Sequence, residues 1–147
     1  MHFTSDVMVE RSQRQVDAFF AEPANLAKWD RSVARVIPTS EGATAVGFTF
    51  DTIAPSGLRM SYRITEHVPA ERTSIALEHS PMFREALWCL SYQSLPSGTR
   101  IRCDVTFTLR PRYALLIIPL LLTQRRALRR DLTFLKAAIE AHEGVEA

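Results

Sequence analysis

The chain has 147 residues, a length that suits one domain with a sizeable buried core and no need of disulfides or structural metals. Hydrophobic residues make up 46% of the sequence and charged residues 23%, which excludes an intrinsically disordered chain. The formal net charge of +2 is too small to indicate a nucleic-acid-binding protein.

The first residues alternate polar and apolar side chains, so they lack the apolar core of a secretion signal. The longest apolar run, from Ala114 to Leu122, is interrupted by Pro119 and is far shorter than the roughly 18 to 20 residues that span a bilayer. Cys89 and Cys103 do not have the pattern of a disulfide framework. We therefore expect a soluble cytoplasmic protein in which both cysteines stay reduced.

The N-terminal part is expected to form one strand and two short helices. Residues 3–10 alternate apolar and polar side chains, as a half-buried strand does. Ser12 and Gln15 have the spacing of a capping box, which predicts a helix that starts here and buries one apolar stripe. Pro23 suits the first turn of a second short helix, which should stop by Arg31.

Short turns rich in Pro, Gly and Ser divide the middle of the chain into strands. Within these strands apolar and polar side chains alternate, so one face of the sheet is expected to be buried and the other exposed to solvent. The regular spacing of strands and turns is typical of an antiparallel meander. The expected strands span residues 33–39, 47–53, 58–68, 73–79, 83–94 and 99–110.

The C-terminal segment is expected to be a long helix that covers the sheet. It should begin after Pro111, be kinked or restarted at Pro119, and end by Gly144. Its arginines fall on or near the side opposite an apolar stripe, as in an amphipathic helix. The stripe consists of Leu121, Leu128, Leu132, Leu135 and Ile139, and the arginines are Arg125, Arg126, Arg129 and Arg130.

The order of elements is thus one strand, two short helices, several strands and one long helix. It predicts an α+β fold in which residues 1–147 form one domain: a curved antiparallel β-sheet with two short N-terminal helices and a long C-terminal helix over a cavity. A curved sheet that grips one long helix leaves space between the two. That space is typical of an internal ligand cavity rather than of a surface cleft.

Several segments, in a specific order and spacing, are similar to those of one known superfamily. They are VERSQRQVDAFF at residues 9–20, PANLAKW at 23–29, VG at 46–47, YRITEHVP at 62–69, GTR at 98–100 and the arginine-rich tail up to Leu135 and Lys136. On these segments the chain resembles the START/SRPBCC superfamily, close to its polyketide cyclase/dehydrase and birch-pollen-allergen-like proteins with the helix-grip fold. The resemblance implies a cavity between sheet and helix, near which Trp29 lies. It implies no particular reaction, because members include lipid and hormone binders, polyketide aromatase/cyclases and quinone-binding chaperones.

Two hairpins supply candidate binding residues on the inner face of the sheet. In the first hairpin, the register that turns Tyr62 and Leu77 inward places Met60 opposite His79. His79 is then expected on the inner face, where a histidine can donate or accept a proton. A position at the strand end, bonded to backbone or water, is the simpler interpretation of the same residue.

In the second hairpin, Cys103 is expected to point inward and Cys89 outward, so the two thiols cannot meet the geometry of a disulfide. Trp88 and Tyr92 are then amphipathic cavity walls that need partners for their polar tips, or they are plain core residues. The inward sets are Ile101, Cys103 and Val105 on one strand and Ala86, Trp88, Leu90 and Tyr92 on the other.

Few other residues suggest chemistry. Asp30, directly after Trp29, is expected at the cavity mouth as a polar anchor. Asp51, Glu78 and Asp104 lie on faces assigned to solvent. The histidines and cysteines have none of the spacings of a metal site, and the glycines form no phosphate-binding loop. We therefore expect no metal and no cofactor.

The stretch from Tyr113 to Leu122 is unusually apolar and leaves two interpretations open. It is the start of a helix packed over the sheet, and the nearby arginines are then a solvated helix face. Alternatively it is a mobile, partly exposed gate that touches a membrane or a lipid ligand. In that case the arginines would meet anionic headgroups.

The sequence therefore predicts a protein that binds a hydrophobic or aromatic small molecule, or a lipid, in a cavity between sheet and helix. One alternative is a polyketide cyclase or aromatase that uses His79 or a tyrosine as acid or base. The other is a lipid or quinone carrier that docks on membranes through the apolar stretch. Whether the protein is an enzyme, which ligand it takes and its oligomeric state stay open. The expected ligand-binding residues are Trp29, Asp30, Met60, Tyr62, His79, Trp88, Leu90, Tyr92, Cys103, Val105 and Leu128.

Overall fold

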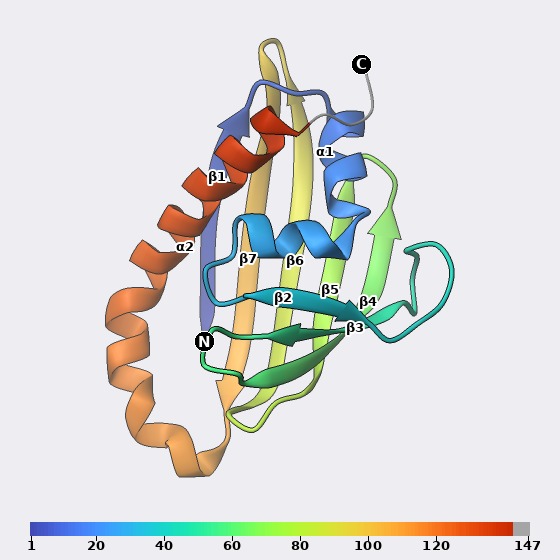
Figure 1. The fold of residues 1–147 in the computed structure, drawn as a ribbon. Coiled ribbons are helices and arrows are strands. Elements are labelled where there is room, and N and C mark those ends of the chain that lie inside the picture. Colours follow the sequence, from blue (N-terminus) through green and yellow to red (C-terminus); the bar gives the residue numbers. More distant parts are fainter. Residues whose placement is uncertain (143–147) are drawn as a thin grey trace.

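Seven strands form one curved antiparallel sheet in the computed structural model, which describes residues 1–142 (Figure 1). The order of strands across the sheet is β1-β7-β6-β5-β4-β3-β2, so the first strand of the chain pairs with the last. The predicted α+β helix-grip fold is confirmed. The elements are β1 His2–Val9, α1 Gln13–Phe20, η1 Pro23–Lys28, β2 Arg35–Pro38, β3 Thr49–Ile53, β4 Arg59–Val68, β5 Arg72–His79, β6 Phe83–Leu95, β7 Gly98–Leu109, η2 Pro111–Leu116 and α2 Ile117–Ala141, where η denotes a 3₁₀ helix.

The start of α1 is closed by the predicted capping box. Ser12 Oγ accepts a hydrogen bond from the backbone N–H of Gln15 at 3.2 Å, and Gln15 Oε1 accepts one from the Ser12 N–H at 3.0 Å. This reciprocal pair satisfies two N–H groups that a helix start otherwise leaves without partners. α1 then buries Val16 and Phe19 against β6 and β7, and Pro23 occupies the first turn of η1.

The β6–β7 hairpin has the predicted register. Trp88 lies opposite Val105 and Leu90 lies opposite Cys103, so all four side chains share the inner face. Cys89 lies on the other face, where its Sγ accepts a hydrogen bond from the hydroxyl of Ser74, and the two cysteines are not bonded to each other. The aromatic and apolar wall expected from the sequence is therefore present on this hairpin.

The β4–β5 hairpin departs from the prediction at one end. Tyr62 pairs with Leu77, as expected, but Ser61 pairs with His79, so β5 contains one extra residue at this point. Such a β-bulge shifts the side chains beyond it to the other face of the sheet. The predicted pairing of Met60 with His79 is therefore wrong, and His79 is exposed on the outer face.

The outer face of the sheet also buries one carboxylate that was expected in solvent. Arg59 lies over Asp51, and Arg59 Nε donates a hydrogen bond to Asp51 Oδ2 at 2.6 Å. Burial alone would raise the pKa of Asp51, but hydrogen bonds from Ser61 and Arg59 outweigh it and hold that pKa below its ordinary value. The aliphatic part of an arginine can thus shield a carboxylate from water on a sheet face that the alternation of side chains predicts to be solvent-exposed.

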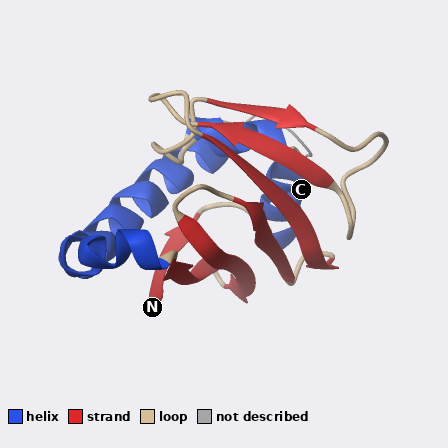
Figure 2. Cartoon of the chain, turned by 90° about the horizontal axis from the view of Figure 1, so that it is seen from below, coloured by secondary structure: helices blue, strands red, loops and turns tan. Residues whose placement is uncertain are grey.

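The second half of α2 covers the inner face of the sheet, as Figures 1 and 2 show. Leu128, Leu132, Leu135 and Ile139 are buried, as predicted. Leu121 was expected in the same stripe, but 49% of it is exposed, so this prediction is wrong. The physical reason is visible in Figure 1, where the orange start of α2 lies away from the sheet and its red end packs beside β1 and α1.

The boundaries of α2 also differ in part from those expected. The helix begins at Ile117, so Pro119 occupies its first turn, where proline is tolerated because the N–H it lacks would have no partner within the helix. The helix ends at Ala141. The predicted end at Gly144 lies outside the described residues.

Candidate functional site

A pocket of about 340 Å³, called the main pocket below, lies between the inner face of the sheet and the middle of α2. It is lined by β4, β6 and β7, the turn after η1, the loops before β4 and β6, and residues 124–131 of α2. Its volume falls in the range of small-molecule sites, roughly 300 to 1,000 Å³. Exposed residues such as Arg31 and Arg130 belong to the lining, so the pocket is open to solvent at this end.

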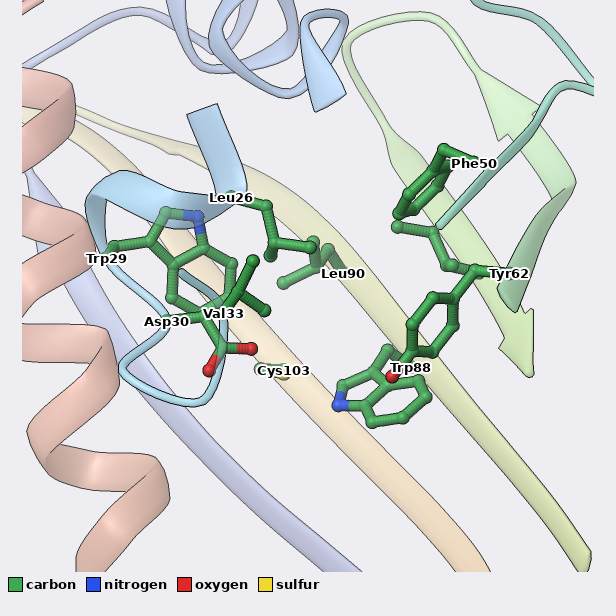
Figure 3. A pocket seen from close by; sticks show the side chains of 10 residues that line it. Leu26, Trp29, Asp30, Val33, Phe50, Tyr62, Trp88, Leu90 and Cys103 are labelled. Atoms are coloured by element: carbon green, nitrogen blue, oxygen red, sulfur yellow. The ribbon is translucent and has the colours of Figure 1, made fainter. Parts of the chain in front are cut away.

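A narrower hollow of about 40 Å³, called the inner chamber, adjoins the main pocket (Figure 3). Its remaining walls come from η1, the segment after η1, β3, β5 and β6, at Leu26, Val33, Phe50, Ile75 and Leu90. The inner chamber extends the main pocket toward η1, β3 and β5 and adds to its apolar lining. The two hollows share Trp29, Asp30, Tyr62, Trp88 and Cys103.

A larger hollow of about 590 Å³ lies elsewhere, along the free edge of β1 and beneath α2. Its lining consists mainly of short polar side chains together with Arg102 and Arg129, and it is more open to solvent than the main pocket. Ligand sites are usually concave and mostly apolar, with a few polar groups that fix orientation. The main pocket with its inner chamber is therefore the candidate site.

Two aromatic walls face each other across this site. On one side, Tyr62 and Trp88 pack edge to face with ring centroids 5.4 Å apart, and Phe50 stacks on Tyr62 at 5.6 Å. On the other side, Trp29 packs edge to face against Phe20 with centroids 6.4 Å apart. Figure 3 shows Trp29 and the Tyr62–Trp88 pair on opposite sides of the hollow. Flat walls of this kind suit a ligand that contains rings, because aromatic groups pack offset or edge to face.

The charged groups in the lining are two carboxylates and two arginines, all contributed by the turn after η1 and by α2. Asp30 Oδ1 accepts hydrogen bonds from the backbone N–H and the hydroxyl of Ser32, at 2.9 and 2.6 Å, which hold this carboxylate at the turn. Asp131 Oδ1, on α2, is buried and accepts no hydrogen bond from any residue of 1–142. Arg130 Nη2 lies 3.8 Å from that oxygen, beyond hydrogen-bonding distance.

The environment of Asp131 changes its acidity. Burial, and to a smaller extent the negative charge of Asp30, raises the pKa of Asp131 to about 6, although Arg130 and Arg31 act in the opposite direction. A carboxyl with this pKa exchanges its proton close to neutral pH, as acids and bases in active sites do. Asp131 can therefore accept a hydrogen bond from a bound ligand or move a proton to or from it.

Two other ionisable side chains of the lining are held neutral. Burial raises the pKa of Cys103 to about 12, so its sulfur stays a thiol and is no nucleophile at neutral pH. Burial also raises the pKa of Tyr62, whose hydroxyl donates to Met60 Sδ at 3.8 Å. These groups offer apolar surface and a phenolic donor rather than a base.

The structure brings most of the sequence-predicted site residues together. His79 does not join them, because the β-bulge turns it to the outer face. Tyr92 does not line the two hollows either. It is buried at the next inward position of β6 after Leu90, where it stacks on Phe20 with ring centroids 5.7 Å apart. Those that line the main pocket or the inner chamber are Trp29, Asp30, Met60, Tyr62, Trp88, Leu90, Cys103, Val105 and Leu128.

Sequence reasoning missed several lining residues, of which Asp131 matters most. A signal for it was present, since Asp131 lies three residues after Leu128 and four before Leu135, on the buried face of the helix. A carboxylate on such a face is unusual and indicates either a partner or a function. The other missed residues are Leu26, Arg31, Ser32, Val33, Phe50, Ala54, Leu58, Ile75, Met82, Phe83, Gln124, Ala127 and Arg130.

The described part of the chain contains neither a cluster of metal ligands nor a membrane-spanning helix. Within residues 1–142, no three His, Cys, Asp or Glu side chains gather in a way that could hold a metal ion. In the same residues, no helix is both long enough and apolar enough to cross a membrane.

The sequence matches a protein family described as "Polyketide cyclase / dehydrase and lipid transport" over residues 1–140. The chain belongs to this family. The membership confirms the resemblance to the START/SRPBCC superfamily. No curated protein matches the chain.

Solved structures of the family fold are similar over nearly the whole chain. TTHA0849 from Thermus thermophilus superposes with a TM-score of 0.81 at 13% identity, over 98% of this chain and 100% of that one. Ara h 8.0201 gives 0.72 at 12% identity, over 97% and 99%. The di-domain ARO/CYC BexL from the BE-7585A biosynthetic pathway gives 0.70 at 18% identity, over 97% of this chain and 50% of that one. At such identities the similarity shows the fold alone.

Proposed function

We propose that the protein binds a hydrophobic or aromatic small molecule in the main pocket. The observation that carries the proposal is the pair of aromatic walls, Trp29 on one side and Tyr62 with Trp88 on the other, around a pocket of about 340 Å³. A ring-containing ligand between these walls removes apolar surface from water on both of its faces, which contributes roughly 25 cal/mol per Å².

The charged end of the pocket sets a second requirement for the ligand. Asp30 and Asp131 are both hydrogen-bond acceptors; Ser32 donates to Asp30, whereas the buried oxygen of Asp131 has no donor within residues 1–142. A buried acceptor without a partner costs free energy, so a ligand hydroxyl or amine at this position is favoured. The proposed ligand is therefore largely apolar, contains a ring, and carries at least one hydrogen-bond donor at one end.

The family supports the proposal in general terms. Its description names both polyketide chemistry and lipid transport, and both involve large hydrophobic molecules. Ara h 8.0201 and the aromatase/cyclase BexL have the same fold with little sequence identity. Because the family description names more than one function, the choice among them depends on the side chains in the pocket.

Binding can be tested with a neutral aromatic probe, N-phenyl-1-naphthylamine, whose fluorescence rises in apolar sites. Both tryptophans of the chain, Trp29 and Trp88, line the main pocket, so energy transfer from tryptophan to the probe reports occupancy there. Ala127 lines the same pocket from α2. Ala127→Phe should fill part of the pocket and weaken probe binding about tenfold or more.

A matched control is present on the same helix. Ala137 is exposed, so Ala137→Phe adds the same side chain without reaching the pocket and should leave probe affinity unchanged. Melting temperatures of both variants check that they fold. The proposal is overturned if the wild type shows no saturable energy transfer, or if both variants weaken binding equally.

A second candidate function is catalysis on a polyketide-like substrate, and the Asp30–Asp131 pair is the observation that favours it. A carboxyl with a pKa of about 6 is suited to take a proton from an activated methylene group, the first step of an intramolecular aldol condensation. In this function Asp131, rather than His79 as expected from the sequence, is the acid or base. If this function holds, Asp131→Asn should retain probe binding and abolish ring formation from a linear poly-β-ketone thioester. Equal ring formation by both proteins would leave binding as the proposed function.

A further inference from the structure

The start of α2 and the preceding η2 expose a group of large apolar side chains. Leu115 is 92% exposed, Leu122 78% and Ile118 65%. Elsewhere in the described residues, exposed large apolar side chains lie apart from one another, at Met8, Val46 and Leu87. The group, called the apolar tip below, consists of Leu115, Leu116, Ile117, Ile118, Leu121 and Leu122.

The chain segment that contains the apolar tip carries charged side chains of one sign only. From Val105 to Arg130 the sequence contains no Asp or Glu, while it contains six arginines. The first turn of α2 has no acidic residue and no side-chain cap, so the partial positive charge of the helix start adds to that of the arginines. The six arginines are Arg110, Arg112, Arg125, Arg126, Arg129 and Arg130.

We propose that the apolar tip docks on the surface of a bilayer that contains anionic lipids. Ile118, Leu122, Arg125 and Arg129 follow one another three or four residues apart, so they lie on one face of α2. Arg125 lies about 10 Å along the helix axis from Ile118, at about 1.5 Å per residue. Apolar side chains of interfacial helices enter about 5 to 10 Å into the boundary between headgroups and acyl chains. With the start of α2 inserted end-on to that depth, Arg125 is level with the phosphates.

The arginines are available for this role. Within residues 1–142, Arg125, Arg126 and Arg129 form no ion pair with a carboxylate, and all three are exposed. Arg110 and Arg112 donate to the backbone carbonyls of residues 80 and 81, at 3.1 and 2.9 Å. These two bonds fix the entrance to η2 against the loop before β6, which gives the tip a rigid base.

A second copy of the chain fits the tip less well than a lipid surface. In a two-fold dimer the same patch meets itself, so the arginines around both tips would approach each other with no carboxylate from this segment between them. An anionic bilayer supplies both the apolar phase and the opposite charge. The charge pattern therefore favours the membrane as the occupant.

The docking proposal does not depend on the proposed binding function, but the two sites are adjacent. Met82 and Phe83, in and after the loop that Arg110 and Arg112 hold, line the main pocket, and so do Gln124 and Ala127 of α2. A docked tip would therefore bring an edge of the pocket near the bilayer.

Vesicle flotation tests the proposal with the full chain. Vesicles of phosphatidylcholine mixed with phosphatidylglycerol should carry the protein, and vesicles of phosphatidylcholine alone should carry much less. The triple variant Leu115→Gln/Ile118→Gln/Leu122→Gln should lower partition about a hundredfold, because three side chains lose their insertion. Arg125→Gln/Arg126→Gln should lower it about tenfold or more and reduce its sensitivity to salt.

Matched controls separate the tip from general surface effects. Val46→Gln/Leu87→Gln removes two exposed apolar side chains elsewhere, and Arg35→Gln/Arg100→Gln removes two exposed arginines elsewhere. Neither pair should lower partition as the tip variants do, and melting curves show that all variants fold. The proposal is overturned if the protein does not bind anionic vesicles, if it binds both vesicle types equally, or if the triple variant floats with anionic vesicles as the wild type does. A dimer that depends on the tip, without vesicle binding, would also overturn it in favour of self-association.

Discussion

The two halves of α2 contain similar amounts of leucine and isoleucine, yet the fold places them in opposite environments. In residues 117–127, four of the five such side chains are exposed, whereas in residues 128–139 all four are buried. The second half packs against β1 and the sheet, whereas most of the first half lies away from both and only Leu120 of its leucines and isoleucines packs against the core (Figure 1). The amount of apolar side chain in a helix therefore does not decide whether that part of the helix is buried.

The pattern of the apolar residues does distinguish the halves. In the second half the leucines and isoleucine recur three or four residues apart and most of the other positions are polar, which is the pattern of a helix with one buried side. In the first half, apolar residues occupy nearly every face, so one sheet could cover only some of them. Such a segment needs a second apolar environment, and the proposed bilayer surface is one.

Truncation of one leucine in each half should give the largest measurable contrast. Leu132 is fully buried, so Leu132→Ala should lower the free energy of unfolding by about 2 to 5 kcal/mol through lost burial and a residual cavity. Leu122 is largely exposed, so Leu122→Ala should change it by less than about 0.5 kcal/mol. Urea titrations of both variants measure the difference, and equal losses would mean that the first half is also packed.

The contrast shows what sequence patterns can and cannot predict. The capping box of Ser12 and Gln15, the β6–β7 register and the stripe from Leu128 to Ile139 all follow from local periodicity, and the structure confirms them. Leu121 has the same spacing as that stripe but lies beyond the surface it would cover. The length over which a sheet supports a helix is a property of the whole fold, and local periodicity does not contain it.

For the candidate site, too, local patterns predict some of the residues and not others. Most of the residues predicted for it line the pocket, because strand alternation decides which side chains face inward. His79 does not, because one extra residue in β5 reverses the alternation, and nothing in the sequence marks the bulge. Asp131 was missed although its helical position pointed to the buried face, since a charged residue is ordinarily assigned to solvent.

The pH dependence of stability tests the polar position within the buried half. The folded state raises the pKa of Asp131 to about 6, above its ordinary value in the unfolded chain, so the folded protein binds its proton more tightly. Ionisation of Asp131 therefore lowers the free energy of unfolding. The whole of this loss is present above about pH 6, and it disappears as the pH falls toward 4. Asp131→Asn should stabilise the protein at pH 7.5 by on the order of 1 to 3 kcal/mol and have little effect near pH 4.

Urea titrations of wild type and Asp131→Asn across this pH window measure the effect, with Asp6→Asn on the exposed side of β1 as the control. A stabilisation that grows toward low pH would contradict the assigned environment of Asp131. A flat difference across the window would mean that its carboxyl titrates as it does in the unfolded chain.

The smallest expected effect concerns Arg129, which lies in the buried half but on its exposed face. It has no ion pair within residues 1–142, and it lies four residues after Arg125, where like charges on a helix repel. Arg129→Ala should therefore raise the free energy of unfolding by a few tenths, at most about 0.5 kcal/mol, since alanine is also the better helix former. Salt screens the repulsion, so part of the gain should fade at high ionic strength while the part due to alanine remains. A loss comparable to that of Leu132→Ala would mean that α2 is rotated about its axis, with the arginines directed toward the pocket. An anionic ligand would then replace the apolar one as the proposed ligand. Burial would then differ between the faces of α2 rather than between its two halves.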